Sequence, residues 1–200
     1  VIIDPEKWLC IPVRVGQLTM HVYFDRDFLS HAVSLVNLFE LAGHEEARQK
    51  PDGILIFGVA PAALRGEPTV FYEDEDNDLV LGIIAKSEEV DYFGYFKKML
   101  LTMHNVIMMR RGRLPIHGAM CHMEFKNGSC SNVVIVGDSG AGKSETLEAF
   151  RVLADDWLRE MTTVFDDMGS LALTEEGKLI AYGTEIGAFV RLDDLDVGYA

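Results

Sequence analysis

Residues 137–144 read GDSGAGKS and fit the pattern G-x-x-x-x-G-K-[ST] at every fixed position. The four residues before this loop are all β-branched, which is typical of a strand, and residues 145–150 are typical of a helix. A glycine-rich loop between a strand and a helix lets successive backbone N–H groups point at phosphate oxygens. This feature constrains the chain most strongly, and it predicts an α/β fold around a nucleotide-binding P-loop. A glycine-rich turn that matches by chance is the weaker alternative.

The P-loop motif also assigns roles to single residues. Lys143 is expected to reach the β- and γ-phosphates of ATP, and Ser144 to supply an oxygen to Mg²⁺. The net charge is −14, so this loop must hold a triphosphate against the overall field of the protein. The predicted nucleotide-binding residues are Gly137, Asp138, Ser139, Gly140, Ala141, Gly142, Lys143, Ser144 and Glu145.

Further candidate residues lie on both sides of the P-loop. Asp166 and Asp167 follow residues 162–165, which favours carboxylates at the end of a strand. Beside a P-loop such carboxylates hold metal ions, directly or through water, although a polar turn is the alternative. His117 precedes the P-loop strand, and Lys98 lies in a long helical pattern. Taken singly, a histidine is more often structural and a lysine is more often solvated.

Composition excludes several classes of protein. The chain has 200 residues, of which 48% are hydrophobic and 25% charged, as in ordinary globular proteins with one large or two small domains. The net charge argues against a nucleic-acid or polybasic membrane surface, and the longest nearly apolar run, residues 53–64, is too short to cross a membrane. Three cysteines without a CxxC pair indicate a reducing cytoplasm. The chain starts without Met or a targeting segment, so we expect an internal piece of a longer protein.

Hydrophobic periodicity predicts the other elements. Strands are expected over residues 18–24, 54–59 and 161–165, and helices over residues 28–41, 92–113 and 144–157. Hairpins are expected around residues 73–78 and 175–178. The first of these turns is acidic, and a solvated loop explains it better than a cation site because it lacks the glycine spacing of a calcium loop.

Five motifs in order resemble the catalytic core of phosphoenolpyruvate carboxykinase, particularly the ATP-using branch. They are YFGYFKK at 92–98, IHGAM at 116–120, the P-loop, VFDD at 164–167 and GTEIGAFVR at 183–191. The resemblance implies that Lys98, His117 and Asp167 ligate Mn²⁺, that Ser144 binds the Mg²⁺ of ATP, and that Asp166 orients its shell. A lysine ligates a metal only when neutral, so the resemblance also requires a lowered lysine pKa.

The same resemblance implies a reaction. Oxaloacetate would lose CO₂, and the resulting enolate would take the γ-phosphoryl group of ATP to give phosphoenolpyruvate, a step of gluconeogenesis. Lys143 and Arg191 would offset the charge that develops during transfer. The implied partners are ATP and a small dicarboxylate, with neither nucleic acid nor membrane.

Departures from the carboxykinase pattern leave two alternatives. Asp138 and Glu145 give the spelling GDSGAGKSE, which resembles HPr kinase/phosphorylase, a protein-serine kinase. Arg191 stands where the carboxykinases use lysine. Together with Asp138 and Glu145 it leaves a third alternative, a nucleotide-binding regulatory module without catalysis. For the fold we expect residues 1–113 to form part of an N-terminal α/β domain. Residues 114–200 are expected to start a P-loop nucleotide- and metal-binding domain with a mixed sheet, left incomplete.

Overall fold

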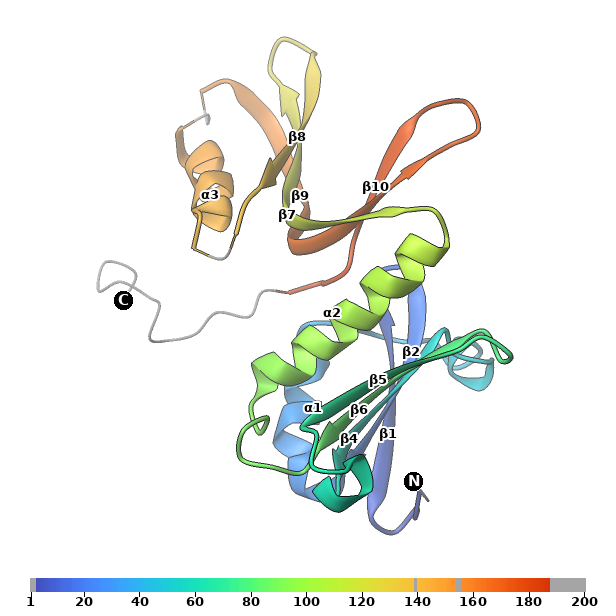
Figure 1. The fold of residues 1–200 in the computed structure, drawn as a ribbon. Helices are drawn as coiled ribbons and strands as arrows, with labels where there is room; N and C mark the ends of the chain where they lie inside the picture. Colours follow the sequence, from blue (N-terminus) through green and yellow to red (C-terminus); the bar gives the residue numbers. More distant parts are fainter. Residues whose placement is uncertain (1–2, 139, 154–155, 188–200) are drawn as a thin grey trace, which may run out of the picture.

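A computed structural model describes residues 3–138, 140–153 and 156–187 and has a mixed α/β fold with two sheets (Figure 1). The first sheet has the strand order β3 (Glu40–Leu41), β1 (Trp8–Val15), β2 (Leu18–Asp25), β4 (Gly53–Val59), β6 (Leu79–Ala85) and β5 (Thr69–Asp74). The pairs β2–β4 and β4–β6 are parallel, and the others are antiparallel. The acidic turn at residues 75–78 joins β5 to β6, as the sequence predicts.

Helices α1 (Leu29–Leu35) and α2 (Phe93–Arg110) share one core with the first sheet. Short 3-10 helices at Arg26–Phe28, Glu46–Arg48 and Pro61–Leu64 complete this part. Phe57 of β4 stacks on Phe96 of α2, with ring centroids 4.7 Å apart, and both side chains are fully buried. Burying one such ring contributes about 2–3 kcal/mol, so this contact anchors α2 on the sheet.

The second sheet has the order β10 (Leu179–Gly183), β9 (Leu158–Leu173), β7 (Leu114–Phe125) and β8 (Cys130–Val136), and every pair is antiparallel. Helix α3 (Lys143–Leu153) packs on one face, where its Leu147 contacts the core formed by Ala119, Cys121 and Met123 of β7. In the described part of the chain, the P-loop strand β8 is therefore an edge strand.

Several elements differ from the sequence-based expectations. The sheet around the P-loop strand is antiparallel rather than mixed, and the parallel pairs lie in the first sheet. The helix expected over residues 28–41 ends at Leu35, because the chain turns there and places Leu38 and Phe39 in the core. The expected strand 161–165 is the middle of β9, so Asp166 and Asp167 lie within a strand, not at its end.

The long helical pattern at residues 92–113 corresponds to α2, which closes at Arg111 and Gly112. Helix α3 is described over Lys143–Leu153, and Asp156 and Trp157 lie in a turn, so the helix does not reach the predicted limit at residue 157. None of the described helices is both long and apolar enough to cross a membrane.

Candidate functional site

The P-loop runs from the end of β8 to the start of α3. Gly140 and Gly142 have φ values of 76° and 82°, a left-handed conformation that suits glycine. Lys143 is buried, and its Nζ donates a hydrogen bond to the backbone oxygen of Asp138 at 2.8 Å. Lys143 is thus folded back over its own loop, where a phosphate oxygen would compete with this carbonyl for the ammonium group. Ser139 lies outside the described residues.

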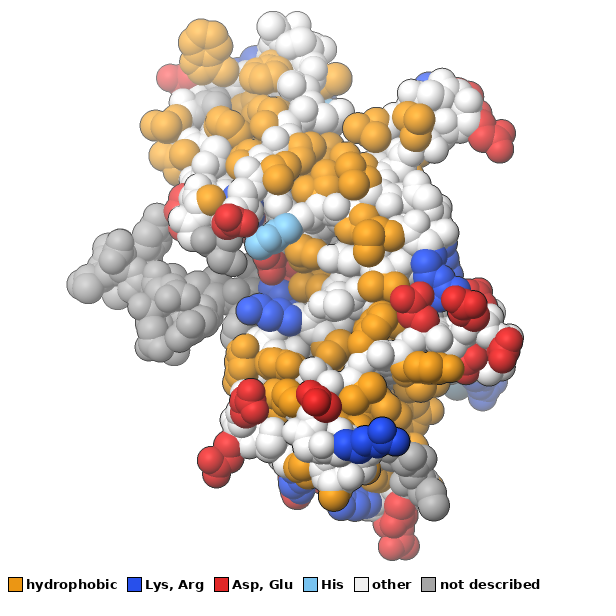
Figure 2. Space-filling model, viewed as in Figure 1, with side chains coloured by type: hydrophobic (Ala, Val, Ile, Leu, Met, Phe, Trp, Pro, Cys, Tyr) orange, Lys and Arg blue, Asp and Glu red, His pale blue; other side chains and the backbone are white. Residues whose placement is uncertain are grey.

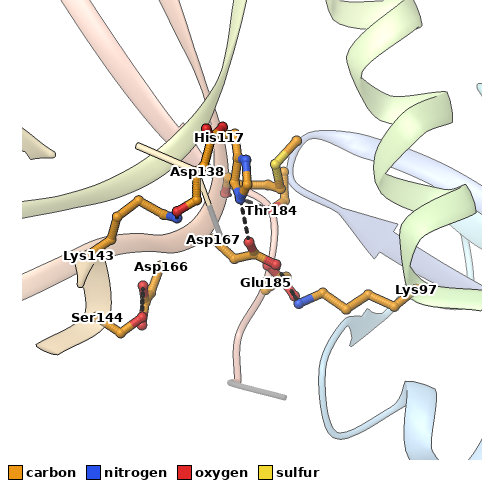
Figure 3. Close-up of polar contacts among 10 residues, drawn as sticks. Lys97, His117, Asp138, Lys143, Ser144, Asp166, Asp167, Thr184 and Glu185 are labelled. Atoms are coloured by element: carbon orange, nitrogen blue, oxygen red, sulfur yellow. Dashed lines mark hydrogen bonds and ion pairs between the residues drawn. The ribbon is translucent and has the colours of Figure 1, made fainter. Parts of the chain in front are cut away.

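A hydrogen bond connects the P-loop helix to the second sheet. Ser144 Oγ donates to Asp166 Oδ1 at 2.9 Å, and these are the two residues predicted to serve the nucleotide's Mg²⁺ (Figure 3). A hydroxyl and a carboxylate oxygen are the ligands that Mg²⁺ prefers. Glu145 is exposed in the first turn of α3, where its charge favours the helix N-terminus.

A second cluster of charged side chains lies beside the P-loop. Lys97 Nζ is 2.7 Å from Asp167 Oδ2 and 2.9 Å from Glu185 Oε1. His117 Nε2 is 3.2 Å from Asp167 Oδ1 on the opposite side of the same carboxylate (Figure 3). Lys97 comes from α2, His117 from β7, and Asp167 from β9, so both sheet layers contribute to the cluster.

Part of this cluster is open to solvent. His117 and Asp167 are 41% and 40% exposed, whereas Lys97 and Glu185 are only 9% and 4% exposed. Figure 2 shows histidine, acidic and basic side chains meeting on this face, between α2 and the second sheet. A solute can therefore reach the His117–Asp167 pair while the Lys97–Glu185 pair stays beneath it.

The structure brings together His117 and Asp167 but leaves out Lys98. Lys97 contacts Asp167 in place of Lys98, because consecutive residues on a helix point about 100° apart. Lys97 lies on the buried side of α2 with Leu101 and His104, whereas Lys98 is exposed. Lys98 instead lines a separate hollow of about 310 Å³ whose other walls are Phe71, Tyr92, Tyr95, Met99 and Thr102.

The strand geometry of β9 sends two neighbouring carboxylates to two different sites. Opposite β7, Met120 pairs with Phe165 and Cys121 with Thr163, so Val164 is an extra residue in a bulge. Asp167 has φ = 100°, which is rare for a residue other than glycine. Bulges and strained backbone at this place re-aim side chains, and here Asp167 contacts the Lys97 cluster while its neighbour reaches the P-loop.

The charges in the cluster shift one another's pKa. Burial raises the pKa of Asp167, but the hydrogen bond and charge of Lys97, together with the charges of His117 and Lys143, outweigh it and hold that pKa below its usual range. Burial lowers the pKa of Lys97, but the charges of Glu185 and Asp167 outweigh it and raise that pKa. The ammonium of Lys97 is thus stabilised, which is the reverse of what a metal-ligating lysine requires.

Glu185 is a site residue that the sequence reasoning did not select. Neither of its buried oxygens accepts a well-directed hydrogen bond from the described residues, and the ion pair with Lys97 is its main compensation. Burial raises the pKa of Glu185 to about 7, against the pull of Lys97. The signal in the sequence was the GTEIG segment, a glutamate flanked by glycines close after a β-hairpin.

The side chains of this cluster offer several donors to a transition metal. In the described chain, no three His, Cys, Asp or Glu side chains are grouped to hold a metal by themselves, and Lys97 lies between Asp167 and Glu185. The imidazole of His117 and the carboxylates of Asp167 and Glu185 are nevertheless donors of the type that Mn²⁺ accepts. His117 and Asp167 therefore present donor types that fit a metal, with the Lys97 ammonium as a neighbouring charge. Arg191 lies outside the described residues.

Searches among protein families and curated proteins place the chain in no group. No family model matches it, and no curated protein matches it either. The geometry of the two adjoining sites is therefore the basis for a functional proposal.

Proposed function

We propose that this protein transfers the γ-phosphoryl group of ATP, and that the reaction is the carboxykinase one. The observation that carries the proposal is the placement of Asp166 and Asp167. One carboxylate joins Ser144 of the P-loop, and the next joins the Lys97–His117 cluster. A phosphate donor and an anionic acceptor held at these two points would lie side by side, as phosphoryl transfer requires.

The chain's own residues would act as follows. Lys143 would leave the carbonyl of Asp138 and pair with the phosphates, while Ser144 and Asp166 would face the Mg²⁺ of ATP. Oxaloacetate would lose its C4 carboxylate as CO₂, and the electron pair of the broken bond would form the enolate. The enolate oxygen would then bond to the γ-phosphorus as the bond to the ADP oxygen breaks.

A divalent metal held by His117 and Asp167 would supply Lewis-acid stabilisation of negative oxygen. Lys97 would hold its positive charge beside the developing enolate, with Glu185 fixing the ammonium from below. The free cysteines Cys10, Cys121 and Cys130 support a reducing, cytoplasmic setting for this reaction.

The test is an assay of the full chain with oxaloacetate, ATP, Mg²⁺ and Mn²⁺, in which phosphoenolpyruvate is measured by ³¹P NMR. Turnover that disappears in Lys143→Ala and falls strongly in His117→Ala would support the proposal. ATP binding without phosphoenolpyruvate formation would refute it.

A protein-serine kinase is the second candidate, and the charged state of Lys97 favours it. A protonated lysine cannot ligate Mn²⁺, and Lys98 lies outside the cluster, so two features of the carboxykinase pattern are missing. In this reaction Asp167 would accept the proton of a serine hydroxyl. Transfer of ³²P from ATP to a small carrier protein would identify this activity. ATP binding without phosphoenolpyruvate formation and without phosphorylation of a carrier protein would indicate a regulatory module.

A further inference from the structure

Residues 183–187, GTEIG, form a strap that leaves β10 and crosses to the first sheet layer. Two backbone hydrogen bonds fasten it there. Gly16 N–H, in the turn between β1 and β2, donates to the oxygen of Thr184 at 3.2 Å, and Ile186 N–H donates to the oxygen of Leu38 at 2.8 Å. These two bonds lie on either side of Glu185, so the backbone of that residue is held from both neighbours.

Close packing adds to this attachment. A Cβ atom at Gly187 would lie 2.4 Å from the backbone oxygen of Asn37, so only glycine allows the strap to approach so closely. Thr184 is 3% exposed, and its hydroxyl donates to the oxygen of Met168 in β9 at 2.9 Å. The strap is thus tied to both sheet layers within a few residues.

The ion-pair partner of Glu185 is Lys97, which belongs to the first sheet layer. Lys97 lies on α2, and α2 shares its core with the first sheet, whereas Asp167 lies on the second sheet. Lys97 therefore contacts both Glu185 of the strap and Asp167 of the second sheet. The long lysine side chain has several rotatable bonds, and contacts with two carboxylates restrict its conformational freedom.

We propose that Glu185 is a positioning residue: the strap fixes its carboxylate, and the carboxylate fixes the Lys97 ammonium against Asp167. The role of that ammonium in phosphoryl transfer rests on the proposed function. The positioning itself depends only on the contacts of the strap.

The test measures the reactivity of Lys97 in the folded, full chain without nucleotide. Brief acetylation with an N-hydroxysuccinimide ester, followed by peptide mass spectrometry, gives the rate at Lys97 relative to Lys98. Lys98 is a built-in reference, because it is exposed and has no ion-pair partner among the described residues. Glu185→Gln and Gly187→Ala are expected to raise this ratio about tenfold, since a buried charged contact is lost. Glu176→Gln makes the same change of charge at an exposed position in the β9–β10 turn and leaves the ratio unchanged.

The conservative variant Glu185→Asp separates positioning from general loosening. It keeps the charge with a shorter side chain, so it should recover part of the protection that Glu185→Gln loses. An unchanged ratio in Glu185→Gln would overturn the proposal, as would an equal rise in Glu176→Gln. Gly187→Ala is the variant most prone to misfold, and Glu185→Gln adds no heavy atoms and tests the same contact. A raised ratio in a protein without phosphoryl-transfer activity would leave the strap standing and refute the proposed function alone.

Discussion

Replacing Glu185 by glutamine should change how the stability of the protein depends on pH. The folded protein raises the pKa of this carboxyl from 4.5 to about 7. Between these values the folded state binds a proton that the unfolded state has released, so the free energy of unfolding falls as pH rises. A shift of this size corresponds to a loss on the order of 3 kcal/mol across the interval. Glutamine cannot ionise, so the Glu185→Gln variant should not lose this free energy of unfolding as pH rises.

The assay is urea unfolding of both proteins at steps from about pH 4 to about pH 8. Burial also lowers the pKa of His21 and His104, which makes stability fall as pH decreases, but this contribution is common to both proteins. The difference between the two curves therefore isolates Glu185. Glu176→Gln, at an exposed position in the β9–β10 turn, is the matched control and should follow the wild-type profile. Parallel curves for wild type and Glu185→Gln would refute the reasoning.

Three further predictions follow from the packing and the two sites. Lys97→Met should cost about 3 kcal/mol in urea unfolding, because it leaves two carboxylates without a cation, whereas Lys98→Met should stay within about 0.5 kcal/mol. Phe96→Ala should cost about 3–5 kcal/mol and lower the Tm measured by calorimetry, and a smaller loss would show that the core relaxes around it. Ser144→Ala should weaken Mg·ATP binding by calorimetric titration while lowering stability by about 1 kcal/mol, because only the bond to Asp166 is lost.

The P-loop and the long helix could be predicted from the sequence because both are local patterns. The helix pattern could also have identified the correct lysine. The apolar stripe through Phe96, Leu100 and Ile107 places Lys98 on nearly the opposite side of α2, with Lys97 at the border of the stripe. The resemblance selected Lys98 because its distance in sequence from His117 matches the family pattern. Such a spacing does not specify which face of a helix is buried.

Other parts of the site depend on contacts between distant segments. The bulge in β9 and the positive φ of Asp167 arise from pairing with β7, and no local signal predicts either. The β9 strand itself was underestimated because polar residues interrupt its apolar pattern. The strap contacts Gly16, which is separated from it by most of the sequence. The contacts of Glu185 therefore form only when both sheet layers are folded.

The adjacency of Asp166 and Asp167 also has a thermodynamic consequence. One peptide unit joins the two carboxylates, so a displacement at the P-loop side is transmitted to the other cluster without any intervening element. Ligands at the two points are then linked, and the linkage is reciprocal. If Mg·ATP changes the affinity of the neighbouring cluster for a cation by some factor, that cation must change the affinity for Mg·ATP by the same factor. Titrating each ligand in the presence of the other measures this heterotropic coupling directly.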